Sequence, residues 1–190
     1  HGYASDITRT YAFEQNDFAA LIARMDTLML NAVEGLRPGK SYVDLHITTY
    51  QEIAKVLAEF NLIDCSAESA VDAGIVSTFF PHGLGHHLGL QVHDVGGYMA
   101  DERGTHINAP DNHPFLRTSR IVEANQVFTI EPGLYFIDSL LATLKASEHG
   151  KLVNWTNVEK MRPYGGIRIE DNIIIHQSNN ENMTRDCKLD

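Results

Sequence analysis

Residues 81–94 read Pro-His-Gly-Leu-Gly-His-His-Leu-Gly-Leu-Gln-Val-His-Asp, and four histidines and three glycines fall within these fourteen positions. Glycine lets a backbone turn sharply or approach another group closely, and histidine binds metals or transfers protons near neutral pH. The stretch is therefore typical of a functional loop. Helical patterns precede it and strand patterns follow it, which predicts an α+β fold.

Two long helices are predicted before this loop. Asn16 and Asp17 offer a cap for the first, and apolar residues then recur at helical spacing as far as Ala32. The second begins at residues 41–44, which resemble a capping box with Asp in place of Glu, and it runs to about residue 61. A short third helix is predicted over residues 67–74.

Strands are predicted where β-branched and aromatic residues alternate with polar ones. These segments are residues 1–13, residues 126–137 with a break at Pro132 and Gly133, and residues 165–177. Residues 83–119 are rich in glycine, histidine and proline and have no regular pattern. Loops of that length in a compact domain are usually functional or disordered.

Composition narrows the class of protein. The net charge of −10 argues against a nucleic-acid partner, which needs a basic surface. No apolar run approaches the ~20 residues of a membrane span, and no signal-peptide pattern is present. Cys65 and Cys187 are the only cysteines of 190 residues, which favours a reducing compartment and a cytoplasmic location, although the two could pair. Because the chain opens at His1 without Met, we expect a fragment of a longer protein.

Two glutamates interrupt apolar strand patterns. Glu131 lies in Val-Phe-Thr-Ile-Glu-Pro-Gly, and Glu170 lies in Gly-Ile-Arg-Ile-Glu-Asp-Asn. A carboxylate in a buried strand is costly unless it is paired or binds a metal. The alternative is that Glu131 shares a solvent-facing side with Thr129, because strand residues alternate between faces. Single histidines are also more often core or surface residues, and we expect His87, His106 and His113 to have no role in the site.

One imidazole among carboxylates would form a hard, oxygen-rich site. Such a site suits Mn²⁺ or a related divalent ion better than a zinc held by thiolates. Two ions can share bridging carboxylates and activate a water between them, which fits hydrolysis of an amide or a phosphoester.

Four motifs, in this order along the chain, resemble the C-terminal half of bacterial Xaa-Pro dipeptidases (prolidases). They are Pro-His-Gly-Leu-Gly-His, Val-His-Asp-Val-Gly, Thr-Ile-Glu-Pro-Gly and Gly-Gly-Ile-Arg-Ile-Glu-Asp. The wider group is the pita-bread metallopeptidases, which include aminopeptidase P and methionine aminopeptidase. The resemblance implies that residues 1–190 form a C-terminal catalytic domain with the pita-bread fold. It also implies that an N-terminal domain and the first strand or strands lie upstream.

The resemblance implies a set of metal ligands, which are Asp6, His86, Glu131 and Glu170. The family has a fifth, an aspartate that would lie upstream of His1. Asp6 and Glu170 would bridge two ions, and His86 with Glu131 would complete one of them. We therefore expect this chain to hold one divalent ion well, Mn²⁺ in the first place and Co²⁺ or Zn²⁺ as alternatives, and to be weakly active or inactive by itself.

The resemblance also implies catalytic roles. Glu131 would accept and carry the proton, and His93 would contact the scissile carbonyl. His82 would lie near the terminal carboxylate of the substrate. Arg168 would anchor that carboxylate, or it would instead form an ion pair with a neighbour such as Asp171. Tyr42 and Leu116 would line the substrate pocket, although a tyrosine at a helix start is more often a packing residue.

The implied function is metal-dependent hydrolysis of Xaa-Pro dipeptides, in an intact protein that forms a homodimer. Two alternatives remain. The same centre could hydrolyse phosphotriesters, as organophosphorus-acid anhydrolases of this group do, or the domain could be a non-catalytic pita-bread binding module. Retention of the four ligands counts against the second alternative. We expect a proline-containing dipeptide as the partner, and neither nucleic acid nor membrane.

Overall fold

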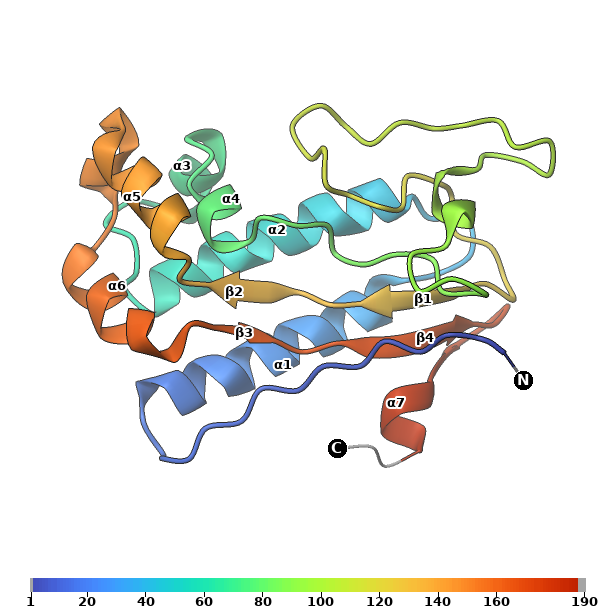
Figure 1. Ribbon diagram of the computed structural model, residues 1–190, viewed down its shortest axis with the longest axis horizontal. Helices are drawn as coiled ribbons and strands as arrows, with labels where there is room; N and C mark the ends of the chain where they lie inside the picture. Colours follow the sequence, from blue (N-terminus) through green and yellow to red (C-terminus); the bar gives the residue numbers. More distant parts are fainter. Residues whose placement is uncertain (1, 188–190) are drawn as a thin grey trace.

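The computed structural model describes residues 2–187, and in it helices precede the first strand while further helices lie between the strands (Figure 1). Before the histidine-rich loop the elements are α1 (Asp17–Gly35), α2 (Tyr42–Glu59), α3 (Ala67–Asp72) and α4 (Val76–Phe79). The central elements are the 3₁₀ turn η1 (Val95–Tyr98), β1 (Val127–Ile130), β2 (Gly133–Tyr135), α5 (Asp138–Ala146), η2 (Glu148–Leu152), α6 (Trp155–Met161) and η3 (Arg162–Tyr164). The chain continues through β3 (Gly166–Arg168), β4 (Asp171–Ile175), β5 (Asn180–Asn182) and α7 (Met183–Asp186).

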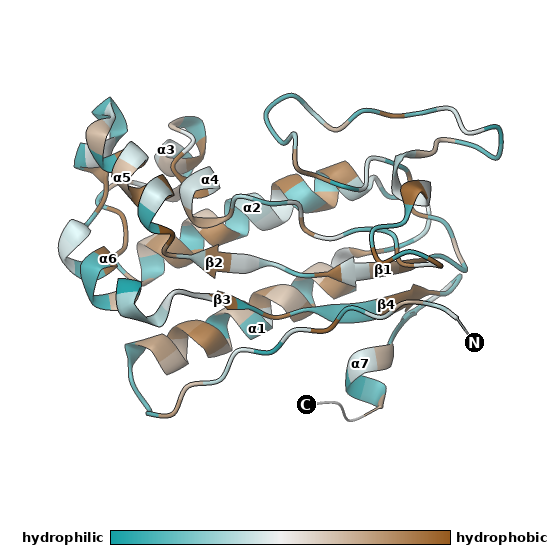
Figure 2. Cartoon of the chain, in the orientation of Figure 1, coloured by the Kyte–Doolittle hydropathy of each residue, from teal (hydrophilic) through white to brown (hydrophobic). Residues whose placement is uncertain are grey.

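The two long helices confirm the predicted caps. The Asn16 side chain accepts hydrogen bonds from the backbone N–H groups of Phe18 and Ala19, and the Ser41 hydroxyl accepts one from Asp44. Each helix has one apolar face. The apolar faces of α1 and α2 pack against each other and against the strands, which removes them from solvent. In Figure 2 both helices alternate brown and teal along their turns, whereas the long loop over residues 99–116 is mostly teal.

The strands form two short antiparallel ladders that lie end to end. β1 pairs with β4, with Ile130 opposite Asp171, and β2 pairs with β3, with Gly133 opposite Arg168. The pairing continues from one ladder to the other without a shift. The residues between the ladders, 131–132 on one side and 169–170 on the other, therefore also lie opposite each other. β5 pairs with the other edge of β4. Helices and strands together confirm the α+β class.

The predicted strand over residues 1–13 is wrong for the described part, and His1 lies outside the described residues. Residues 2–13 hold a single isolated bridge, between Thr8 and Glu170. Further along, the hydroxyl of Thr10 donates to the carbonyl of Arg168 and accepts from its N–H. The Thr10 hydroxyl thus occupies the N–H and carbonyl of Arg168, which the backbone of a continuing strand would use. The ladder therefore stops after Thr8.

Two other segments differ from the sequence predictions. Residues 165–177 form two strands, β3 and β4, because the pairing is interrupted at Ile169 and Glu170. Helices α5 and α6 fall in residues 138–164, for which the sequence yields no prediction. Helix α5 lacks a side-chain cap and buries only Leu141 and Leu144, so its local signal is weak. No helix in residues 2–187 is both long and apolar enough to span a membrane.

Candidate metal centre

Glu131 and Glu170 lie directly opposite each other in the gap between the two ladders. The register that pairs Ile130 with Asp171 and Gly133 with Arg168 places the two glutamates as partners. Their exposed fractions are 8% and 1%, which excludes the solvent-facing alternative for Glu131. Like charges opposite each other destabilise a sheet, so this pair requires a proton or a cation.

His86 comes from residues 84–88, which run alongside β1. Three backbone hydrogen bonds join them, from Leu88 to Val127, from Thr129 to His86, and from Glu131 to Leu84. The Thr129 hydroxyl also accepts from the His86 backbone N–H. These bonds place the Nε2 atom of His86 3.5 Å from the nearer carboxylate oxygen of Glu131.

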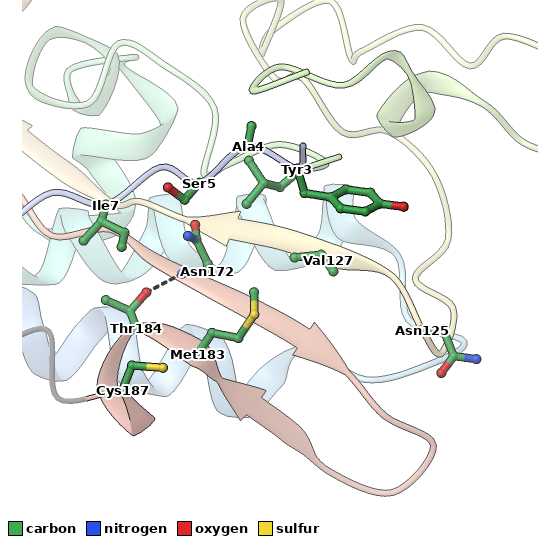
Figure 3. Close-up of a pocket in the computed structure, with 11 residues that line it drawn as sticks. Tyr3, Ala4, Ser5, Ile7, Asn125, Val127, Asn172, Met183, Thr184 and Cys187 are labelled. Atoms are coloured by element: carbon green, nitrogen blue, oxygen red, sulfur yellow. Dashed lines mark hydrogen bonds between the residues drawn. The ribbon is translucent and has the colours of Figure 1, made fainter. Parts of the chain in front are cut away.

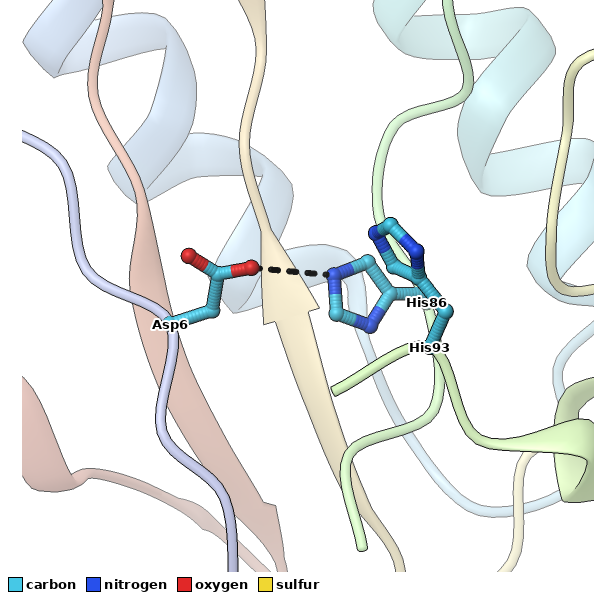
Figure 4. Close-up of side chains that lie close together, drawn as sticks. All are labelled: Asp6, His86 and His93. Atoms are coloured by element: carbon cyan, nitrogen blue, oxygen red, sulfur yellow. Dashed lines mark ion pairs between the residues drawn. The ribbon is translucent and has the colours of Figure 1, made fainter. Parts of the chain in front are cut away.

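Asp6 reaches the same point from the N-terminal segment, on the other side of Glu170. Its Oδ2 atom lies 3.6 Å from the Nε2 atom of His86, and the His93 ring stands edge-on beside His86 with 4.5 Å between the ring centres (Figure 4). The Thr8 hydroxyl donates a 2.8 Å hydrogen bond to Glu170 Oε2. Four extended segments thus supply the four ligands that the resemblance implies.

The donor atoms fit a divalent cation. The Nε2 atom of His86 and the Oε1 atom of Glu170 are buried and have no hydrogen-bond partner among the described residues. Ligand atoms of His86, Glu131 and Glu170 lie within 4.8 Å of one another, as do those of Asp6, His86 and His93. Buried polar atoms without partners are rare, and a neutral imidazole among carboxylates suits a hard ion.

Electrostatics support the same conclusion. Burial, with a further contribution from the neighbouring Glu170, raises the pKa of Glu131 to about 8. Burial also raises the pKa of Glu170 and lowers the pKa of His86, which keeps the imidazole in its neutral, metal-binding form. Without a cation, the protein would hold a proton on the glutamate pair at neutral pH.

A cavity of about 200 Å³ opens beside the ligands. It is lined by His82, Gly83, Gly85, His93, Phe115, Arg117, Glu131 and Arg168. The four residues assigned to catalysis therefore share one cavity. Arg168 points its Nη1 atom at Glu131, 3.4 Å from the carboxylate, and the ion pair with Asp171 is not formed.

The sequence profile of metallopeptidase family M24 matches residues 1–177. The chain belongs to metallopeptidase family M24. It is 71% identical over 189 residues to the Xaa-Pro dipeptidase of Colwellia psychrerythraea and 61% identical to that of Shewanella woodyi. The matches cover 100% and 99% of this chain, which spans 43% of the length of each relative.

Solved structures confirm the pita-bread fold of the M24 family. A histidine-to-alanine variant of Escherichia coli aminopeptidase P is 28% identical, with a TM-score of 0.70 over 97% of this chain and 36% of that one. A glutamate-to-alanine variant of the same enzyme, in complex with substrate, gives 27% identity and the same TM-score and coverage.

Tyr135 is a residue of this M24 site that the sequence analysis missed. The Nδ1 atom of His82 lies 2.7 Å from the carbonyl of Gly83, so this nitrogen donates. Burial lowers the pKa of His82 to about 4, so its Nε2 is an acceptor at neutral pH and takes the Tyr135 O–H at 2.8 Å. The Tyr135 oxygen in turn accepts from Arg168 Nε at 2.7 Å. His82 therefore orients Arg168 through Tyr135.

Two residues expected to line the substrate pocket lie elsewhere in the M24 domain. Tyr42 is fully buried, and its hydroxyl donates to the carbonyl of Thr129, which fits the packing alternative. Leu116 lines a neighbouring cavity of about 340 Å³. His87 packs edge-on against Phe128 and lines neither cavity.

A larger cavity, of about 590 Å³, lies beside the N-terminal segment. Tyr3, Ser5 and Ile7 line it together with residues of β1, β4 and α7 (Figure 3). None of the four expected ligands lines this cavity, so its size does not make it the candidate site.

A second pair of histidines lies behind His82. The Nε2 atom of His46, a residue of α2, is 3.0 Å from the Nδ1 atom of His113. His46 is 1% exposed, and burial, with smaller contributions from His113 and His82, lowers its pKa to about 3. His113 is thus a partner of a buried residue, although it does not reach the metal ligands.

His46 should make the folded protein sensitive to acid. The unfolded chain takes up this proton near pH 6.5 and the folded protein only near 3, so stability falls as the pH is lowered through that window. One such proton contributes a slope of about 1.4 kcal/mol per pH unit. We expect His46→Gln to flatten the pH dependence of the free energy of unfolding, measured in urea, with replacement of the half-buried His149 as the control. An unchanged slope in His46→Gln would contradict the prediction.

Proposed function

We propose that the protein hydrolyses Xaa-Pro dipeptides with divalent metal ions held by Asp6, His86, Glu131 and Glu170. The observation that carries the proposal is the opposed, buried Glu131–Glu170 pair beside a cavity that contains an oriented arginine. The Xaa-Pro dipeptidases at 61% and 71% identity support this substrate class. Mn²⁺, a cytoplasmic location and a homodimeric intact protein belong to the same proposal.

Each side chain of the site has a separate role in hydrolysis. Bound divalent ions supply polarisation of the carbonyl and a nucleophilic water near neutral pH. Glu131, whose pKa lies near 8 in the metal-free protein, accepts a proton at its carboxylate and passes it to the leaving amine. His93 faces the cavity and donates a hydrogen bond to the oxygen on which negative charge develops.

Arg168 is placed to bind the carboxylate of the substrate's proline. Its guanidinium lines the cavity. Its Nε atom is held by Tyr135 and its Nη1 atom lies 3.4 Å from the Glu131 carboxylate, which leaves Nη2 for the substrate. An arginine fixed in this way loses little rotamer freedom on binding. The contribution of His82 is to set the direction of the Tyr135 hydroxyl, and through it that of Arg168.

The experiment that tests the proposal is turnover of Leu-Pro with added Mn²⁺, measured beside a phosphotriester, in the intact protein. We expect Mn²⁺-dependent cleavage of Leu-Pro. Phosphotriester turnover alone would favour the alternative hydrolase, and neither activity would favour the non-catalytic module.

Metal titration of the chain tests the ligand set directly. By the resemblance, Asp6, His86, Glu131 and Glu170 would hold one ion fully and a second ion only in part, so one tightly bound Mn²⁺ per chain is expected. Because Glu131 carries a proton at pH 7, binding should release about one proton, which calorimetry in two buffers detects. Two tightly held ions per chain, or no proton release, would contradict this assignment.

A further inference from the structure

A buried charge network lies next to the metal ligands and takes no part in the chemistry above. Asp171 follows Glu170 in sequence and is fully buried. Its Oδ1 atom lies 2.7 Å from Nη2 of Arg9, as an ion pair without hydrogen-bond alignment. Its Oδ2 atom accepts from Arg185 Nε at 2.8 Å and from Asn182 Nδ2 at 2.7 Å. Two arginines thus neutralise one carboxylate from opposite sides.

The two arginines connect Asp171 to different parts of the molecule. Arg185, in α7, also pairs with Asp26 of α1, so its contacts join β4 to helices away from the ligands. Arg9 lies in the segment that carries Asp6. Its Nη1 atom donates to the carbonyls of both Thr8 and Glu170, each at 3.0 Å. One guanidinium therefore ties together the backbones of the two segments that supply Asp6 and Glu170.

The N-terminal segment has few other attachments near Asp6. Its backbone bonds to Gly89 through Ala4 and to Glu170 through Thr8, whose N–H donates at 3.4 Å and whose carbonyl accepts at 3.0 Å. The hydroxyls of Thr8 and Thr10 add side-chain contacts. The Thr8–Glu170 bridge is the one strand pairing of residues 2–13, and the Arg9 contacts reinforce it three residues from Asp6.

We propose that Arg9 and Asp171 are a positioning pair for the metal centre, which sets the separation of Asp6 and Glu170 and thereby the affinity for the ion. The inference rests on the proposed function, because it takes Asp6 and Glu170 as ligands. Groups that orient ligands without touching the metal commonly change metal affinity by 10–100-fold when they are removed. The competing explanation is that Arg9–Asp171 is only a buried ion pair that stabilises the fold, as Arg185–Asp171 does.

The test compares Arg9→Met with Arg185→Met in the full chain, because each removes one arginine from the same buried carboxylate. Mn²⁺ affinity is measured by electron paramagnetic resonance of the free ion, and the melting temperature is measured without metal. Both variants should melt at lower temperature than the wild type. Arg9→Met should bind Mn²⁺ at least about tenfold more weakly, whereas Arg185→Met should stay within about twofold of the wild type.

Arg9→Lys covers the case in which Arg9→Met does not fold. Lysine keeps the charge but cannot contact Asp171 and the two carbonyls together, so weakened Mn²⁺ binding is expected in this variant as well. Wild-type affinity in a folded Arg9 variant, or equal losses in the Arg9 and Arg185 variants, would overturn the proposal. If the wild type itself does not bind Mn²⁺ or Zn²⁺, the proposed function fails, which is a separate result.

Discussion

Glu131→Gln is expected to lower kcat for Leu-Pro by about 10³-fold, within the range for loss of a general base. The amide cannot accept the proton, and it is a weaker ligand for a hard ion than the carboxylate. The loss should appear in kcat more than in KM, because Arg168 still binds the substrate carboxylate. Steady-state kinetics of the intact, Mn²⁺-loaded protein measure this effect.

The same variant should have the opposite effect on the metal-free fold. The folded protein keeps a proton on Glu131 up to about pH 8, whereas the unfolded chain loses it near 4.5. Stability from this group is therefore full below pH 4.5 and declines as the pH rises to 8. In EDTA at pH 8, Glu131→Gln should melt at or above the wild-type temperature. A variant with full kcat, or one that is destabilised without metal, would contradict the assignment.

Glu52→Gln is the matched control. Glu52 lies on α2 and pairs on the surface with Lys55, where a salt bridge contributes little. Glu52→Gln should leave kcat and the melting temperature unchanged. An effect seen only in Glu131→Gln then comes from the buried position of Glu131 and not from the loss of a carboxylate as such.

Gly85→Ala is expected to destabilise the protein by about 3 kcal/mol and to weaken metal binding, although the added methyl group carries no charge. A Cβ atom on Gly85 would overlap the carbonyl oxygen of Thr129 in β1 and come within 2.6 Å of the Tyr42 hydroxyl. Because these atoms belong to a strand and to a buried side chain, residues 84–88 would have to move away from β1. His86 would move with them.

Gly35→Ala tests whether the effect is specific to that close approach. A Cβ atom on Gly35, the last residue of α1, meets only the end of the Leu45 side chain at 3.1 Å. Alanine is the better helix former by up to ~1 kcal/mol, so this variant should be neutral or stabilised. Chemical denaturation and Mn²⁺ titration of both variants give the comparison. A Gly85→Ala protein with wild-type stability would show that the loop is not packed against β1 as described.

Much of this architecture follows from local sequence. The caps at Asn16 and Ser41 and the apolar spacing between them predict α1 and α2, because a helix bonds only residues close in the chain. The four proposed ligands could also be named from the sequence, through the resemblance of their motifs to those of prolidases. The strand prediction for residues 1–13 failed because Thr10 uses its side chain in place of its backbone toward Arg168.

The tertiary structure decided how those residues meet. The sequence determined that Glu131 and Glu170 interrupt strands, but only the shared register of the two ladders places them opposite each other. The same holds for Asp171, which the sequence offered as a partner for Arg168 and which instead pairs with Arg9 and Arg185. The positions of charges and hydrogen-bond partners depend on the alignment of segments far apart in the chain, and a shift of one residue would turn each side chain to the other face.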